Sequence, residues 1–278
     1  MTTPLHRPVC DLLGCRYPLV LAGMGGVARA QLVAAVSRAG GFGFLGMVRE
    51  PVARICAEVE TVRQAGVERF GVNLIPAATP PALLKAQVGT LIALRVPVVG
   101  LFWDVPADLV ARLRAAGACV VCQVGSVDEA RAALAAGADA LIAQGVEAGG
   151  HVRGEQPLHA VLGEVVPAVR VPVLAAGGLA DGGDVATVLA LGAQGAVFGT
   201  ALIATPEAFA HDHHKQRLLA ATAADTVLTE AFHINWPPGA KVRVLASSVT
   251  RGERGDPFGS ARTVIGEEEG RPIYLFST

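Results

Sequence analysis

The 278-residue sequence has few charged and few aromatic residues: 17% of it is Asp, Glu, Lys or Arg, and 5% is Phe, Trp or Tyr. Its net charge is −1, and no five like charges follow one another. Nothing therefore favours nucleic acid or an acidic membrane surface as a partner. No uninterrupted apolar run reaches the ~18 residues that a membrane-spanning helix needs. Small molecules are the expected partners.

Signals for export and for disulfides are also lacking. The N-terminal stretch MTTPLHRPVCDLLGC interrupts its apolar residues with Pro, Arg and Asp, unlike the core of a signal peptide. We therefore expect a cytoplasmic protein, in which the five cysteines remain reduced. Cys119 and Cys122 have CxxC spacing, but residues three apart in an apolar strand face opposite sides, so we predict buried structural thiols.

A histidine cluster at residues 211–214, with sequence HDHH, has the residue types of a metal site. It is flanked by Lys215 and Arg217, and helical spacing puts only His211 and His214 or Lys215 on one face. No further carboxylate or cysteine completes a convincing ligand set. We expect a solvent-exposed helix there and no bound metal.

Short apolar runs separated by alanine-rich stretches are abundant. Eight runs are candidate strands, at residues 17–23, 41–46, 69–75, 96–103, 118–125, 138–145, 171–178 and 195–200. The stretches between them carry helix signals: residues 126–138 start with a serine cap and acids and stop at a glycine. Apolar strands alternating with helices predict an α/β fold, and eight units predict a (β/α)8 TIM barrel.

The regular pattern ends at Ala204. We assign residues 1–204 to the barrel and residues 205–278 to a C-terminal helical and irregular appendage packed on it. The appendage opens with a helix and includes a polar, glycine-rich stretch at residues 251–272, whose charged part is expected to be mobile.

Glycines follow the last two predicted strands, in LAAGGLADGGD (174–184) and VFGTALIA (197–204). In TIM barrels the loops after strands seven and eight form the common phosphate site, because glycines let backbone N–H groups approach the anion. The predicted cradle is Gly177, Gly178, Gly199 and Thr200, although glycines also serve simple tight turns. Neither GxGxxG after the first strand nor GxxxxGK[ST] is present, so we expect a mononucleotide phosphate.

Three amides also follow apolar runs. Asn73, Gln123 and Gln144 would lie at the same end of the barrel, where a planar amide can donate to and accept from a heterocyclic ring. Each of them alone is more often a structural amide. Together they favour a ring-binding site.

The stretch QGVEAGGHVRG (144–154) presents a histidine behind two glycines. Gly149 and Gly150 let the loop fold tightly, so that His151 points into the barrel mouth. With a pKa near its usual ~6.5, this imidazole would exchange protons at neutral pH, and we predict that it is catalytic. Glu147 is expected to support the loop.

These motifs resemble the nitronate monooxygenase family, formerly called 2-nitropropane dioxygenases, which are FMN-dependent TIM-barrel enzymes. The resemblance covers residues 15–235 and is carried by YPLVLAGMGGVARAQLVAAVSRAGGFGFLG, FGVNLI, CQVGSVDEA, AQGVEAGGHVRG and VPVLAAGGLADGGDVATVLALGAQGAVFGTALIATPEA. One departure is Gly23, which stands where many members have a proline before the methionine.

The resemblance implies an FMN cofactor and a reaction. FMN would lie across the strand ends, and His151 matches the family's catalytic histidine. The implied reaction is oxidation of alkyl nitronates or nitroalkanes by dioxygen to a carbonyl compound and nitrite. The residues implied to bind FMN are Ala22, Gly23, Met24, Asn73, Gln123, Gln144, Gly149, Gly150, Gly177, Gly178, Gly199 and Thr200.

Other enzymes share parts of this pattern. FMN-dependent NAD(P)H reductases, of the quinone or enoyl-acyl carrier protein reductase II type, also carry the Gly-Gly-His motif. A non-flavin phosphate-binding barrel would need a catalytic lysine or carboxylate at a strand end, and no predicted strand ends in lysine. A catalytically silent ligand-binding protein is disfavoured by His151.

Overall fold

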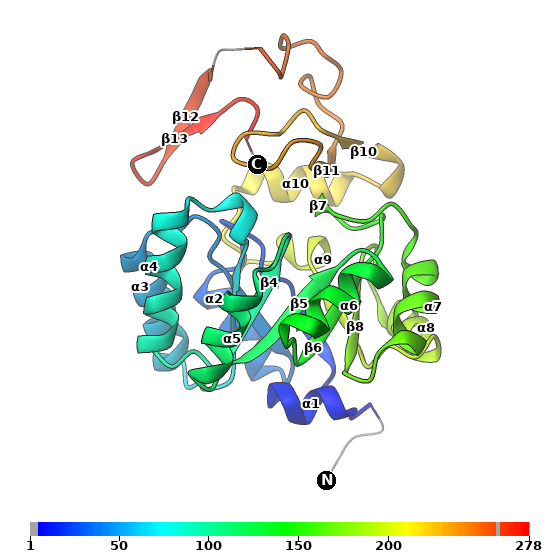
Figure 1. Ribbon diagram of the computed structural model, residues 1–278. Coiled ribbons are helices and arrows are strands. Elements are labelled where there is room, and N and C mark those ends of the chain that lie inside the picture. The colour runs from blue at the N-terminus through cyan, green and yellow to red at the C-terminus, as the bar shows by residue number, and fades with distance from the viewer. Residues whose placement is uncertain (1–4, 260–261, 278) are drawn as a thin grey trace.

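The computed structural model describes residues 5–259 and 262–277, so residues 1–4, 260, 261 and 278 of the predicted barrel and appendage lie outside the described residues. Most of the chain forms a closed barrel of parallel strands in the order β1-β2-β3-β4-β5-β6-β8-β9, in which β9 pairs with β1. The predicted TIM barrel is therefore confirmed (Figure 1).

Each of the eight predicted strands coincides with one strand of the barrel. These are β1 (Leu19–Leu21), β2 (Phe42–Gly46), β3 (Gly71–Leu74), β4 (Val98–Phe102), β5 (Cys119–Val124), β6 (Ala140–Gln144), β8 (Val173–Ala176) and β9 (Gly195–Phe198). The helices that cover them are α2 (Ala30–Arg38), α3 (Val52–Gln64), α4 (Pro81–Ala93), α5 (Ala107–Ala115), α6 (Val127–Ala136), α7 (Leu158–Ala168) and α8 (Gly182–Ala190), with the short η1 (Pro76–Ala78) and α9 (Thr200–Ile203).

The helix signals of residues 126–138 act as expected. The Ser126 side chain accepts a hydrogen bond from the Glu129 N–H at 3.2 Å, which starts α6. Gly137, with a φ of 105°, ends it in the left-handed region. Local capping chemistry therefore sets both ends of this helix.

Side chains of the barrel strands form an inner and an outer hydrophobic layer, because alternate residues of a strand face opposite sides. In the inner layer, the rings of Phe42 and Phe44 meet edge to face at 5.1 Å. Gly71 makes room for Phe44, because a Cβ at that glycine would lie 2.2 Å from the ring. Helix α1 (Pro8–Leu13) closes the end of the barrel at the bottom of Figure 1.

The two cysteines of the CxxC segment are separated as predicted. Cys122 is buried in the outer layer, whereas Cys119 packs against the inner layer. Burial raises the pKa of both thiols to about 12. Both are therefore unreactive at neutral pH.

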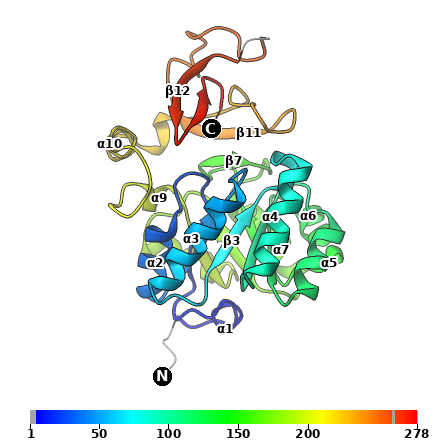
Figure 2. The same cartoon turned by 90° about the vertical axis from the view of Figure 1, so that its left-hand side faces the viewer.

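The residues after β9 lie over the carboxyl ends of the barrel strands (Figures 1 and 2). They include the expected helix, α10 (Asp212–Ala220), whose HDHH segment is exposed as predicted. They also contain η2 (Ala223–Asp225) and four strands that the sequence did not predict: β10 (Thr226–Thr229), β11 (Lys241–Leu245), β12 (Val264–Glu268) and β13 (Arg271–Tyr274). We call residues 205–277 the tail. Its strands show that this segment is more regular than the sequence suggested.

One short strand connects the tail to the barrel. It is β7 (Gly150–Val152), which follows β6 and joins β10 and β11 in a three-stranded antiparallel sheet. Strands β12 and β13 form a separate hairpin. The tail is therefore hydrogen-bonded directly to the loop that carries His151.

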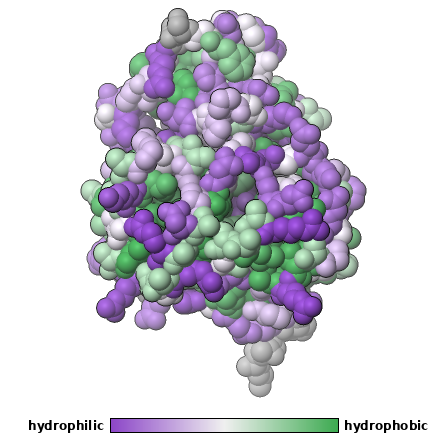
Figure 3. Space-filling view, in the orientation of Figure 1, coloured by the Kyte–Doolittle hydropathy of each residue, from purple (hydrophilic) through white to green (hydrophobic). Residues whose placement is uncertain are grey.

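The surface carries both hydrophilic and hydrophobic residues. Hydrophilic and hydrophobic residues are mixed over the barrel and the tail on the face shown in Figure 3. Within residues 5–259 and 262–277, no helix has the length and the apolar character needed to cross a membrane.

A cluster of ion pairs fixes the β12–β13 hairpin to the barrel. The carboxylate of Glu269, in the hairpin turn, accepts hydrogen bonds of 3.0 and 3.1 Å from Arg29 and lies 2.6 Å from Arg54. Arg29 is nearly buried and stacks on the ring of Phe209 at 3.4 Å. The hydrogen bonds from Arg29 lower the pKa of Glu269, so its carboxylate stays charged at neutral pH.

Substitution of Glu269 should loosen the tail. In Glu269→Gln the buried guanidinium of Arg29 loses its counter-ion, so we expect faster hydrogen exchange of the β12 and β13 amides at pH 7. Glu268→Gln, in the exposed strand beside it, is the control and should leave exchange unchanged. Equal exchange in the two variants would contradict this role of Glu269.

Candidate active site

His151 lies in β7, between the barrel and the tail. In the β7–β11 ladder it stands opposite Val242. On the barrel side, the amide of Gln144 donates to the His151 carbonyl at 3.0 Å and accepts from the Arg153 N–H at 3.3 Å. Gly150 begins the strand with a φ of 77°, which glycine adopts easily. The position of the imidazole thus depends on both the barrel and the tail.

Two tryptophans enclose the imidazole of His151. Trp236, in the tail, stacks on it with ring centroids 3.4 Å apart and an interplanar angle of 13°. Trp103, after β4, meets it edge-on at 6.5 Å. His151 is only 9% exposed, and among the described residues neither its Nε2 nor the Trp236 Nε1 has a hydrogen-bond partner. Both atoms are therefore able to form a hydrogen bond with a ligand or a water molecule at the mouth.

Burial changes the acid–base behaviour of this histidine. Burial, reinforced by the positive charge of Arg49, lowers the pKa of His151 to about 3. The expectation of a pKa near ~6.5 is therefore wrong, because the usual value applies to a hydrated imidazole. At neutral pH the ring is uncharged, so it can form hydrogen bonds but is a weak general base.

Arg153, two residues after His151, ties the loops of the mouth together. Its guanidinium lies 2.7 Å from the Asp104 carboxylate and 2.5 Å from that of Glu129, and it stacks over the ring of Trp103 at 4.7 Å. The charge of Arg153 is thus matched within the protein. Its geometry makes it a support for the mouth and for Trp103.

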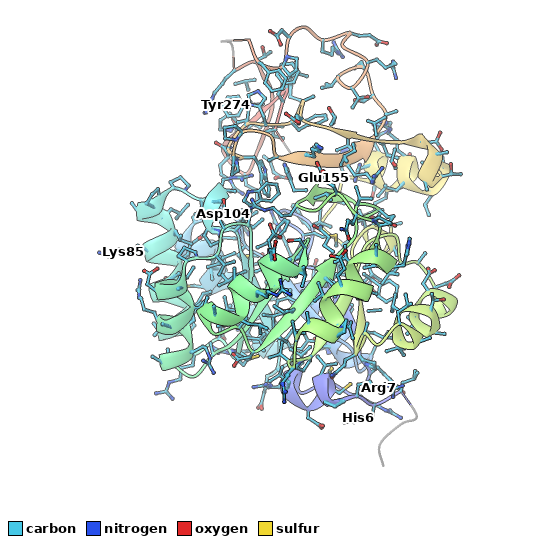
Figure 4. All side chains as sticks on the ribbon, turned by 45° about the vertical axis from the view of Figure 1, so that its right-hand side comes forward. His6, Arg7, Lys85, Asp104, Glu155 and Tyr274 are labelled. Atoms are coloured by element: carbon cyan, nitrogen blue, oxygen red, sulfur yellow. The ribbon has the colours of Figure 1, made fainter. Side chains whose placement is uncertain are left out.

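Two basic residues of β11 attach the tail to the loop after β6. Arg243 donates hydrogen bonds of 2.8 and 3.2 Å to the Val146 carbonyl, and Lys241 lies 3.0 Å from Glu155. In Figure 4, Glu155 and Asp104 both lie at the level where the barrel meets the tail. These contacts keep the tail over the mouth.

Glu147 supports its loop, as predicted. Its carboxylate oxygens accept hydrogen bonds of 3.0 and 3.2 Å from the Leu158 N–H, the first of α7. A carboxylate at a helix N-terminus satisfies a backbone donor that the helix itself leaves free. The role is structural in this conformation.

The residues of the predicted phosphate cradle come together at the ends of β8 and β9. Gly177 and Gly178 have φ angles of 123° and 69°. Gly199 and Thr200 begin α9, where backbone N–H groups lack acceptors within the helix. Gly149 approaches from the loop after β6, and a Cβ there would lie 2.6 Å from the Thr200 Oγ1. This part of the mouth presents backbone instead of bulky side chains, as anion binding requires.

The residues predicted to lie under a ring are at the ends of β1 and β3. Asn73 donates a hydrogen bond to the Gly23 carbonyl at 3.3 Å, and a Cβ at Gly23 would lie 2.3 Å from the Asn73 Cβ. This close approach explains why glycine, and not proline, suits the position in this chain. Ala22 and Met24 both lie beside Gly199, which joins this group to the cradle.

The two glutamines differ in their surroundings. Gln123 is half-buried in β5, in register with Phe102 and Ile142. Gln144 instead uses both ends of its amide on the backbone around His151. The structure therefore gives Gln144 a positioning role where the sequence suggested contact with a ring, because no sequence signal showed that β7 would form beside it.

Sequence reasoning missed Trp103, Trp236 and Arg49. The chain has only two tryptophans, and both lie at the mouth. The rarity of tryptophan was the one signal that could have drawn attention to them. Trp103 ends the fourth apolar run, whereas Trp236 lies far from it in the sequence, in HINWPPGAK (233–241). Arg49 comes three residues after the second predicted strand but carried no motif.

A closed parallel barrel with a buried histidine and a glycine-lined cradle at its carboxyl end defines a TIM-barrel enzyme. The family model described as nitronate monooxygenase matches residues 6–258. The chain belongs to the nitronate monooxygenase family, a family of oxidoreductases, as its motifs suggested.

Several proteins are similar over most of the chain. A (3aS,4S,5R,7aS)-5-hydroxy-7a-methyl-1-oxo-octahydro-1H-indene-4-carboxyl-CoA dehydrogenase of Mycobacterium tuberculosis is 36% identical over 81% of this chain, which spans only 63% of that protein. A probable nitronate monooxygenase of Staphylococcus aureus is 31% identical, over 80% of this chain and 74% of the relative.

Solved structures show the same fold. FabK from Thermotoga maritima has a TM-score of 0.80 and 35% identity, over 86% of this chain and 74% of that one. A nitroalkane oxidase from Streptomyces ansochromogenes has a TM-score of 0.77 and 36% identity, over 87% and 80%. The similar proteins thus include both oxidases and dehydrogenases by name.

A substitution in the cradle tests its role in cofactor binding. If the cradle holds a flavin, Gly178→Leu should lose most of it, because a Cβ there would lie 3.2 Å from the Glu147 Cβ and would displace the loop after β8. Gly239→Leu is a matched control: its φ is 78°, close to the 69° of Gly178, and no atom lies within 4 Å of its Cβ position. Flavin content, measured by absorbance after FMN addition, should fall only in Gly178→Leu; equal contents would exclude the cradle.

The lowered pKa of His151 predicts a pH dependence of stability. Between pH 6.5 and about 3 the unfolded chain binds a proton at this imidazole that the folded chain does not, so the free energy of unfolding decreases as pH falls. When the pH falls from 7 to 5, the free energy of unfolding of the wild type should decrease by about 2 kcal/mol more than that of His151→Gln. Urea unfolding at both pH values measures this, with the exposed His213→Gln as control. An identical loss in all three proteins would show that His151 is not buried in solution.

Proposed function

We propose that this protein is an FMN-dependent oxidoreductase that oxidises alkyl nitronates with dioxygen to a carbonyl compound and nitrite. The observation that carries the proposal is the buried, uncharged His151 with its unpartnered Nε2 at the barrel mouth. A nitronate has already lost the proton from its α-carbon, so its oxidation needs no strong base. Membership of the nitronate monooxygenase family supports the same reaction.

The residues at the mouth fit FMN. The backbone at Gly177, Gly178, Gly199 and Thr200 would hold its phosphate, and the ends of β1 and β3 would hold its ring. When bound, FMN supplies a two-electron acceptor that passes electrons from the substrate to dioxygen. At Gly177 and Gly178 a Cβ would lie 3.2 Å from the loop after β6, so glycine lets these loops approach one another with their backbone exposed to the group.

The protein's own groups would bind and orient the substrate. His151 Nε2 would hydrogen-bond to a substrate oxygen, while Gln144 keeps β7 in place. Trp103 and Trp236 would exclude water and limit the size of the substrate. A small alkyl nitronate suits this aromatic enclosure better than a long acyl chain.

A second candidate is an FMN-dependent NAD(P)H reductase. It is favoured by the likeness to FabK from Thermotoga maritima, at 35% identity and a TM-score of 0.80. The dehydrogenase of Mycobacterium tuberculosis is similarly related, at 36% identity. Trp236 covers one face of the His151 ring in this structure, which leaves no room for a nicotinamide to stack on that face.

Anaerobic spectra of the FMN-loaded protein separate the two functions. We expect propyl nitronate to bleach the flavin absorption band and NADH to leave it unchanged. Bleaching by NADH alone would establish the reductase instead. His151→Asn should keep its FMN and lower kcat for propyl nitronate, because Nε2 no longer holds the substrate. The exposed His213→Asn is the control, and an unchanged kcat in His151→Asn would remove the histidine from the reaction.

A further inference from the structure

Arg49, after β2, has no ion-pair partner within 4 Å among the described residues, although the adjacent Glu50 carboxylate acts on its charge from further away. Its guanidinium makes one long hydrogen bond, 3.4 Å, to the Ala78 carbonyl, and within residues 5–259 and 262–277 it forms no ion pair. The neighbouring carboxylate of Glu50 lies 3.0 Å from Arg271 instead. Arg49 is half-buried, and burial lowers its pKa, an effect that the negative charge of Glu50 offsets only in part. An unpaired charge in such a place is unfavourable unless a ligand of opposite charge binds there.

The location of Arg49 connects it to His151. A hydrophobic cluster of Ile75, Ala78, Phe102, Trp103 and Ala240, with Val48 and Trp236 packed against it, covers the imidazole. Arg49 directly follows Val48, and its guanidinium bonds to Ala78, so it lies at the edge of this cluster. Its charge is close enough to act on His151. The mouth therefore combines a guanidinium that forms no ion pair among the described residues with a buried histidine. His151 is 9% exposed, and its Nε2 has no hydrogen-bond partner there.

We propose that Arg49 determines substrate specificity by binding the two charged oxygens of a small planar anion beside His151 Nε2. The identity of that anion as a nitronate rests on the function proposed above. A guanidinium matches a pair of coplanar oxygens with two parallel hydrogen bonds, and such bonds are strong because both partners are charged. A neutral nitroalkane gains much less from this pairing, so Arg49 selects the nitronate.

The backbone of Arg49 is also unusual. Its φ is 55°, in the left-handed region that residues other than glycine rarely adopt. Contacts around the residue must hold it there. The cradle for the cofactor phosphate lies elsewhere, on β8, β9 and the loop after β6, so Arg49 is free to serve the substrate.

Tryptophan fluorescence can report binding without any turnover, because the chain's only two tryptophans flank His151. The probe is butyrate, which has the planar two-oxygen anion of propyl nitronate but is not oxidised; butyramide is its neutral counterpart. We expect butyrate to change the fluorescence of the FMN-loaded wild type in a saturable way. In Arg49→Gln its Kd should rise about tenfold or more. Butyramide should give no saturable change.

Arg95 offers a matched control for this substitution. It too is an arginine with a left-handed φ, 49°, but it is exposed and precedes β4, at the opposite end of the barrel from the mouth. Arg95→Gln therefore removes one positive charge and, like Arg49→Gln, places a glutamine in a left-handed backbone conformation. It should bind butyrate with the affinity of the wild type. Arg49→Lys keeps the charge without the planar fork, so its Kd should fall between those of the wild type and Arg49→Gln.

The outcomes separate this inference from the proposed function. If Arg49→Gln and Arg49→Lys bind butyrate as tightly as the wild type, Arg49 does not bind the anion. The same conclusion follows if the Arg49 variants lose FMN but keep their affinity for butyrate. If Arg49→Gln weakens butyrate but propyl nitronate never bleaches the wild-type flavin, the anion site stands and the proposed reaction fails. If both hold, Arg49→Gln should raise KM for propyl nitronate about tenfold and leave kcat nearly unchanged.

Discussion

The stack of Trp236 on His151 is the contact on which the arrangement of the mouth depends. It joins a side chain of the tail to a side chain of the barrel loop after β6, with ring centroids 3.4 Å apart. It contributes to the burial that, with the charge of Arg49, holds the pKa of His151 well below the usual range. The contact thus affects both the shape of the mouth and the charge of its central residue.

That contact holds only because the tail is fixed at several other points. Strand β11 pairs with β7, Arg243 donates to the Val146 carbonyl, and Glu269 engages Arg29 and Arg54. Each attachment joins segments that are far apart in the sequence. Charged attachments weaken with salt, so the tail is the part of the mouth whose position responds most to solution conditions.

The imidazole of His151 is uncharged, and the positive charge of Arg49 acts on it, so the site suits some substrates better than others. A site of this kind stabilises an anion that arrives already formed, and it is poorly suited to removing a proton from carbon at neutral pH. For this reason the proposed substrate is the nitronate anion and not the neutral nitroalkane. It also assigns separate tasks to Arg49, which matches charge, and to His151, which offers a hydrogen bond.

The barrel and the glycine-lined ends of β8 and β9 could be predicted from the amino-acid sequence, because apolar runs, helix caps and glycines act locally. The sequence also placed His151 at a strand end. Long-range packing is what encloses this histidine between Trp103 and Trp236 and turns Gln144 toward β7. It also leaves Arg49 without an ion pair among the described residues. These facts depend on which distant segments meet, and a pKa or a partner is set by those neighbours and not by the residue's place in the sequence.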